Sequence, residues 1–82
     1  MKTEFILFCK PSCPYCVKAH ELLQEKDLEY QVVNFEPEDQ QVLDQIKEAY
    51  QWKTVPMVFV KNAQNTTLIG GYSDLALFLE QE

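Results

Sequence analysis

Two cysteines, Cys13 and Cys16, stand two residues apart in the segment CPYC, with Pro14 and Tyr15 between them. Thiols at this spacing can hold a metal, form a structural disulfide or exchange electrons with other disulfides. A bridge between them would close so short a loop that it would remove little entropy from the unfolded chain. A stabilising disulfide is therefore a poor interpretation of the pair.

The position of the pair in the chain favours redox chemistry. Pro14 suits the first turn of a helix, which places Cys13 at the helix start and Cys16 one turn inside. Unpaired backbone N–H groups and the helix dipole favour negative charge at a helix start, and the thiolate is the nucleophilic form of cysteine. Lys10, three residues upstream, can add a positive charge. This asymmetry predicts that Cys13 attacks and Cys16 resolves.

A metal site is the alternative that the same segment leaves open. Cys9, Cys13, Cys16 and His20 are spaced as four possible zinc ligands. The sequence has no second C-x-x-C or H-x-x-H pair, so redox chemistry remains the favoured interpretation. Taken singly, His20 is expected on a helix surface, and Cys9 is expected to be a small buried residue rather than a third redox partner.

Length and charge limit the class of protein. The 82 residues predict one domain, 1–82, and the sequence shows no linker or repeat. Thirteen carboxylates against seven lysines give a net charge of −6, which argues against nucleic-acid and anionic-membrane partners. No apolar run reaches the roughly 20 residues of a membrane helix, and the N-terminal run is too short for a signal peptide. We therefore expect a cytoplasmic monomer, in a compartment that keeps thiols reduced.

Seven elements are expected to position these residues. They are strands at 3–8 and 29–35 with a helix at 14–26 between them, a helix at 37–50, two strands within 56–71, and a last helix at 73–82 capped by Ser73. The order β-α-β-α-β-β-α predicts an α/β fold. Apolar spacing predicts that the second helix turns one stripe of side chains toward the core: Val42, Leu43, Ile46, Ala49 and Tyr50.

Three segments resemble the signature segments of a known family, the dithiol glutaredoxins. They are CPYC at 13–16, TVP at 54–56 and GGYSD at 70–74, and their order and spacing match along essentially the whole chain. The resemblance implies a thioredoxin-like fold, with a four-stranded mixed sheet flanked by three helices. It also implies a glutathione-dependent thiol–disulfide oxidoreductase, with glutathione as co-substrate and no tightly bound cofactor.

The resemblance also implies roles for the residues around the two cysteines. Cys13 would form the mixed disulfide with glutathione, and Val55, before a cis Pro56, would pair its backbone with the tripeptide. Lys10 would face the glycine carboxylate, and Asp74 would bind the γ-glutamyl amine. The other implied glutathione contacts are Thr54, Tyr15, Gly71, Tyr72 and Ser73. Trp52 departs from the small or polar residue that is more usual at its position in the family.

The expected partners follow from this resemblance. They are glutathione and glutathionylated or disulfide-containing proteins, with ribonucleotide reductase as a target that the family suggests. One alternative is an iron–sulfur cluster shared by two subunits with bound glutathione, as some relatives of the family have. Another is an oxidoreductase that takes its electrons from thioredoxin reductase, although the intact TVP and GGYSD segments favour glutathione.

Overall fold

The computed structural model describes residues 3–80. Its elements, in chain order, are β1 (Glu4–Cys9), α1 (Pro14–Glu25), β2 (Glu29–Asn34), the 3₁₀ turn η1 (Pro37–Asp39), α2 (Gln40–Tyr50), β3 (Met57–Lys61), β4 (Thr66–Gly70) and α3 (Tyr72–Glu80). This order confirms the α/β organisation expected from the sequence. Within residues 3–80, no helix is long and apolar enough to cross a membrane.

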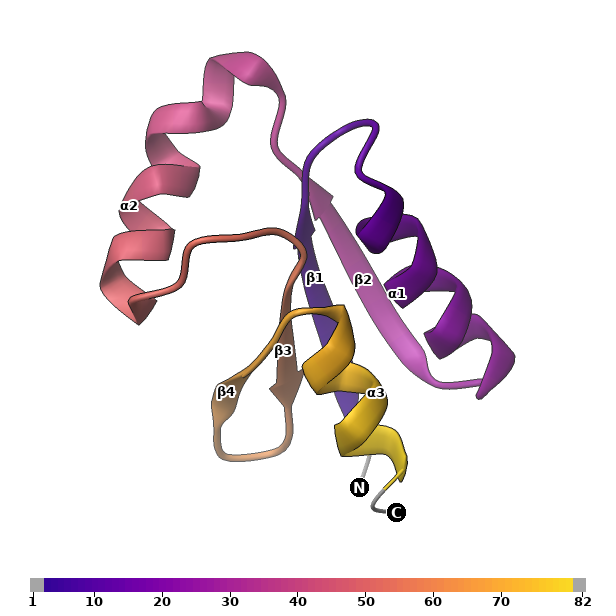
Figure 1. The fold of residues 1–82 in the computed structure, drawn as a ribbon. Helices are drawn as coiled ribbons and strands as arrows, with labels where there is room; N and C mark the ends of the chain where they lie inside the picture. The colour runs from indigo at the N-terminus through magenta and orange to yellow at the C-terminus, as the bar shows by residue number, and fades with distance from the viewer. Residues whose placement is uncertain (1–2, 81–82) are drawn as a thin grey trace.

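The four strands form one mixed sheet in the order β2-β1-β3-β4 (Figure 1). β1 pairs in parallel with β2 and antiparallel with β3, so Leu7 has Val32 on one side and Val58 on the other. β3 and β4 pair antiparallel, as a hairpin. Because the parallel pair needs a crossover, α1 runs between β1 and β2 and carries the chain back across the sheet.

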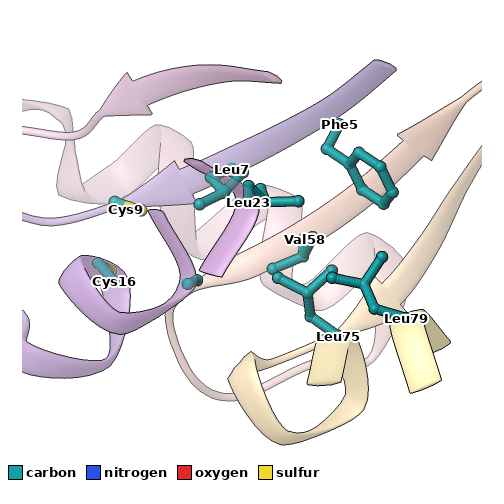
Figure 2. Close-up of a cluster of buried hydrophobic side chains, with 9 residues drawn as sticks. Phe5, Leu7, Cys9, Cys16, Leu23, Val58, Leu75 and Leu79 are labelled. Atoms are coloured by element: carbon teal, nitrogen blue, oxygen red, sulfur yellow. The ribbon is translucent and has the colours of Figure 1, made fainter. Parts of the chain in front are cut away.

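α1 and α3 cover one face of the sheet (Figure 1). β1 alternates its side chains between the two faces, and Phe5, Leu7 and Cys9 point toward these helices. They pack in one core cluster with Leu23 of α1 and Leu75 of α3 (Figure 2). Cys16 belongs to the same cluster, so the core reaches directly under the CPYC segment.

α2 covers the other face of the sheet (Figure 1). Its fully buried residue, Leu43, packs in a second cluster with Met57 and Phe59 of β3. The stripe predicted for this helix is wrong in part, because Val42 is 52% exposed and Ala49 is also exposed. Tyr50 is 48% exposed, but its ring packs against that of Phe59 with the centroids 5.2 Å apart. A single helix lies over this face, so only the residues directed at the sheet are covered.

Two helix starts also differ from the expectation. The predicted helix at 37–50 begins with η1, where Glu36 and Asp39 form a reciprocal capping box. α3 begins at Tyr72, so Ser73 lies inside the helix and the prediction that it caps the helix is wrong. Residues 81 and 82 of that predicted helix lie outside the described part of the chain.

The physical reason for the earlier start of α3 is the side chain of Asp74. Its Oδ2 accepts a hydrogen bond from the Gly71 N–H at 3.0 Å, and the Leu75 N–H donates to the Gly71 carbonyl at 3.0 Å. A carboxylate three residues into a helix that binds the N–H of the residue before it is half of a capping box. Gly71 therefore takes the capping position that the sequence analysis gave to Ser73.

Candidate active site

Cys13 occupies the start of α1, as the sequence predicts. Its backbone is extended (φ −98°, ψ 111°) and Pro14 opens the helix. The Val17 N–H donates to the Cys13 carbonyl at 3.2 Å, which closes the first turn. Ser12, in the left-handed region at φ 63°, turns the chain from β1 into this helix. The side chain of Cys13 makes no capping hydrogen bond and is half-buried, so its sulfur is available at the surface.

The Cys13 sulfur lies next to the segment TVP, which is distant in sequence. Its Sγ is 3.9 Å from the carbonyl oxygen of Val55. The peptide bond that follows, Val55–Pro56, is cis, as the resemblance implied. Pro56 is buried, while Val55 is half-buried. The start of α1 and this turn before β3 therefore meet at the thiol.

A hollow of about 340 Å³, which we call the aromatic hollow, opens beside Val55. Its lining comes from Trp52 and from all three segments that carry the resemblance: Tyr15, Thr54, Val55, Pro56, Gly71, Tyr72, Ser73 and Asp74. The rings of Tyr15 and Tyr72 lie 6.1 Å apart, at an interplanar angle of 37°. The structure thus brings most of the predicted glutathione contacts around one hollow.

Two glycines, Gly70 and Gly71, directly precede α3 and have different requirements. Gly70 has φ +133°, and a Cβ there would collide with the carboxylate of Asp74. This position therefore needs glycine for both its dihedral angle and its space. At Gly71 a Cβ would meet only ordinary contacts, the nearest being the Pro56 carbonyl oxygen at 3.8 Å.

Trp52 enters the aromatic hollow from the end of α2. Gln51 ends that helix in the left-handed conformation (φ 54°), and the Trp52 N–H donates to the Lys47 carbonyl at 2.8 Å. The indole is half-buried and also packs against the second core cluster. Its Nε1 is buried and has no hydrogen-bond partner within residues 3–80. From the sequence, Trp52 was expected as a departure from the family, with packing and a contact to a partner protein both left open.

Lys10 is the predicted contact that the structure does not bring to the aromatic hollow. Its Nζ donates a hydrogen bond to Oε1 of Gln40, at the start of α2, at 2.6 Å. Its side chain lines two other hollows, one beside the cysteines and one beside Phe35 and Pro37.

A second hollow, of about 450 Å³, lies beside the same thiol pair, and we call it the cysteine hollow. Its lining includes all three cysteines and the one histidine: Cys9, Cys13, Cys16 and His20. His20 is partly buried, with its ring 5.0 Å from that of Tyr30, and so is less exposed than the sequence suggested. The sequence grouped these four residues as possible zinc ligands, and the structure brings them to one hollow.

Burial separates the three thiols chemically. Cys13 is half-buried, whereas Cys9 and Cys16 are buried and all three are free. Desolvation by burial, with contacts from the Cys13 and Cys9 side chains, holds the pKa of Cys16 well above its usual range. Burial also raises the pKa of Cys9. Cys16 is therefore held in its thiol form at neutral pH.

The cysteines and His20 are not arranged as metal ligands in this structure. Within residues 3–80, no group of three or more His, Cys, Asp or Glu residues is placed to hold a metal ion. The geometry of the thiols fits sulfur exchange, in which one exposed and one buried thiol act in sequence.

Comparisons with known proteins all match this chain to glutaredoxins. A family model described as glutaredoxin matches residues 5–63. A glutaredoxin 1 of Rickettsia felis is 39% identical over 80 residues, which cover 94% of this chain and 72% of that protein. A dithiolic glutaredoxin of Trypanosoma brucei brucei is 33% identical with a TM-score of 0.75, over 94% of this chain and 77% of that one.

A solved complex of a buckwheat glutaredoxin with glutathione is a further structural neighbour. Its TM-score is 0.81 at 21% identity, over 96% of this chain and 70% of that chain. Together with the element order, these likenesses confirm the thioredoxin-like fold that the three sequence segments implied.

Proposed function

This chain belongs to the glutaredoxin family of thiol–disulfide oxidoreductases, and from that membership we propose that it uses glutathione as co-substrate. Its substrates would be protein–glutathione mixed disulfides and protein disulfides. Cys13 would be the nucleophile and Cys16 the resolving thiol, with no tightly bound cofactor.

One observation carries this proposal. The Cys13 sulfur, at the start of α1, lies 3.9 Å from the Val55 carbonyl oxygen, at the edge of the aromatic hollow. A peptide whose cysteine sulfur meets Cys13 there can lie along the backbone of Val55 and reach Asp74 at the far side of the hollow. A thiol with no such hollow beside it would have no means to select glutathione.

The chemistry of the hollow matches that of glutathione. Thr54 and Val55 offer backbone groups for strand-like pairing with the tripeptide. The first turn of α3, which begins at Tyr72 and contains Ser73, offers backbone N–H groups to the γ-glutamyl carboxylate. A carboxylate can accept several hydrogen bonds, so Asp74 can keep its hydrogen bond from the Gly71 N–H and also accept one from the γ-glutamyl amine. A buckwheat glutaredoxin of the same fold has been solved as a complex with glutathione, which supports glutathione as the ligand.

The aromatic rings would enclose the reacting sulfurs. Tyr15, within the CPYC segment, is 55% exposed and lies beside the ring of Tyr72. A ligand in the hollow would cover this ring and lose water from around its own sulfur. Pro56 would hold Val55 in the orientation that the pairing needs.

Reduction of a glutathionylated protein would need Cys13 alone. The Cys13 thiolate attacks the glutathione sulfur, the target protein leaves as a thiolate, and Cys13 becomes glutathionylated. A second glutathione attacks that mixed disulfide, which releases oxidised glutathione and returns Cys13 to the thiolate. We call this the monothiol route.

Reduction of a protein disulfide would need both thiols. Cys13 attacks the disulfide and stays bonded to one target sulfur. Cys16 then gives up its proton, attacks Cys13 and displaces the target, which leaves a Cys13–Cys16 disulfide for glutathione to reduce. We call this the dithiol route. The burial of Cys16 supports this order, because a protonated thiol does not compete with Cys13 for the first attack.

The remaining parts of the proposal concern partners. Lys10 would bind the glycine carboxylate of glutathione by exchanging its hydrogen bond with Gln40 for the charged group. Ribonucleotide reductase stays a predicted target, and a cytoplasmic monomer stays the predicted form.

The test compares the wild type with Cys13→Ser and Cys16→Ser. Glutathione-driven reduction of a glutathionylated peptide should fall to the uncatalysed rate in Cys13→Ser and persist in Cys16→Ser. Reduction of a protein disulfide should be lost in both variants. Each reaction is followed by the oxidised glutathione that it releases.

Three results would contradict the proposal. Activity on the peptide in Cys13→Ser would show that the nucleophile is wrong. If the wild type were inactive with glutathione but active with thioredoxin reductase, the electron donor would be thioredoxin reductase and not glutathione. A stoichiometric metal in an inactive wild type would instead make the metal alternative the leading one.

A further inference from the structure

Three thiols meet where the cysteine hollow borders the first core cluster. Cys9 ends β1, and Cys16 lies in the first turn of α1 beside it (Figure 2). Cys9 and Cys16 belong to one buried cluster, Cys13 packs against it from the surface, and all three line the cysteine hollow. Exposure falls from the half-buried Cys13 to Cys16 and then to Cys9, so Cys16 lies between the other two thiols in depth.

This order of sulfurs fits a further exchange step. In thiol–disulfide exchange, one sulfur attacks a disulfide sulfur while the other disulfide sulfur departs. When Cys13 and Cys16 are bonded, the sulfur beside Cys9 is that of Cys16, and the sulfur on the far side is that of Cys13. Attack by Cys9 would thus fall on Cys16, with Cys13 as the leaving group.

We propose that Cys9 is a third redox-active thiol, which converts the Cys13–Cys16 disulfide to a Cys9–Cys16 disulfide and releases Cys13. The proposal rests on the dithiol route described above, which supplies the starting disulfide. Cys9 loses its proton to solvent and bonds to the sulfur of Cys16. The electron pair of the broken bond leaves with Cys13, which takes up a proton. The step is an isomerisation and uses no oxidant or reductant.

Burial makes the product different from the starting disulfide. Cys9 is 2% exposed and Cys16 is 7% exposed, while Cys13 stands half-buried at the surface. Glutathione can therefore reach the Cys13–Cys16 bond through Cys13 but is shielded from a Cys9–Cys16 bond. The buried disulfide returns to the reduced form only after Cys13 attacks Cys16 again.

The consequence is a change of reaction route under oxidising conditions. With Cys16 bonded to Cys9, the dithiol route has no resolving thiol and stops. Cys13 is free, and the aromatic hollow beside it is unchanged, so the monothiol route continues. Because burial raises the pKa of Cys9 and slows its attack, this form should accumulate where reduced glutathione is scarce.

The test locates the disulfide in the oxidised wild type. The reduced full chain is oxidised with one equivalent of diamide, without glutathione, and samples are quenched with acid over time. Free thiols are alkylated with a first label under denaturing conditions, and disulfide thiols are then reduced and alkylated with a second. Fragment mass spectrometry of the peptide that carries all three cysteines locates the labels. We expect the first label to move from Cys9 to Cys13 with time, and a first label confined to Cys9 at all times would overturn the proposal.

Two single variants test the order of the sulfurs. Cys13→Ser keeps Cys9 and Cys16, and diamide should close an internal disulfide between them. Cys16→Ser keeps Cys9 and Cys13, which lack the sulfur between them, and should form no internal disulfide. An internal disulfide in Cys16→Ser that forms as readily as in Cys13→Ser would overturn the inferred order. These measurements use no glutathione, so they stay distinct from a failure of the proposed function.

Discussion

At the scale of single residues, Asp74 combines two tasks. Its Oδ2 accepts the Gly71 N–H and so fixes the start of α3, and its side chain also lines the aromatic hollow. The first task needs only a hydrogen-bond acceptor, whereas the proposed contact with the γ-glutamyl amine needs a negative charge. Because the requirements differ, two substitutions can separate them.

Asp74→Asn should weaken glutathione binding and leave stability close to that of the wild type. The amide oxygen can still accept the Gly71 N–H, but the charge is lost. A charged hydrogen bond of about 1.5 kcal/mol predicts a KM for a glutathionylated peptide raised roughly tenfold. Asp74→Ala should raise the KM as much and also cost about 1 kcal/mol of unfolding free energy, because the cap is lost. An unchanged KM in Asp74→Asn would leave Asp74 with the structural task alone.

The roles at the thiols could be predicted in part from the sequence. Pro14 places Cys13 at the helix start, and the structure has it there. The grouping of Cys9 with Cys13 and Cys16 was expected only as part of a possible zinc site, because how closely these thiols approach depends on where β1 ends beside α1. Residues seven apart in sequence, Cys9 and Cys16, meet only through the packing of a strand on a helix.

At the scale of elements, α2 shows how a helix can be recognised while its buried face is not. Apolar spacing predicts the helix, but the extent of burial is set by what lies opposite. The sheet face under α2 meets Leu43, whereas Val42, one position away, is turned to solvent. Val42 and Ala49, both exposed, are the residues on which the sequence prediction was wrong, whereas Tyr50 packs its half-exposed ring against Phe59.

Leu43→Ala and Val42→Ala form a matched pair that measures this difference. Leu43→Ala should lower the unfolding free energy by about 2–5 kcal/mol, since it leaves a cavity against Met57 and Phe59. Val42→Ala removes a half-exposed side chain on the same helix and should change stability by less than about 1 kcal/mol. Urea titration followed by circular dichroism gives both values. Equal losses in the two variants would mean that α2 is packed differently from the structure described.

Element boundaries were harder to predict than the elements themselves. All seven expected helices and strands are present, because apolar runs and turn residues mark them well. The start of α3 was wrong by one residue, since a Ser and an Asp in the first turn compete for the backbone N–H groups. The structure has the carboxylate of Asp74 reaching back to Gly71, and sequence pattern alone does not decide between the two.

At the scale of the whole molecule, the two core clusters share the central strands. Alternate residues of β1 face opposite clusters, with Phe5 and Leu7 on the side of α1 and α3, and Ile6 and Phe8 on the side of α2. β3 likewise contributes Val58 to one cluster and Met57 and Phe59 to the other. Detachment of either helix layer would expose strands on which the other layer also packs. This sharing is in keeping with the predicted single domain.

This sharing predicts that the two layers unfold together. Trp52, the one tryptophan of the chain, packs against the α2 cluster, whereas Leu23 is buried in the other. Leu23→Ala should lower the unfolding free energy by about 2–5 kcal/mol. Because small domains unfold in one cooperative step, tryptophan fluorescence and far-ultraviolet circular dichroism should then shift to the same lower midpoint. If the fluorescence midpoint stayed at its wild-type value while the circular dichroism midpoint fell, the α2 layer would be unfolding separately. In that case the sheet would no longer couple the aromatic hollow, which draws on α2 through Trp52, to the start of α1 that carries the thiols.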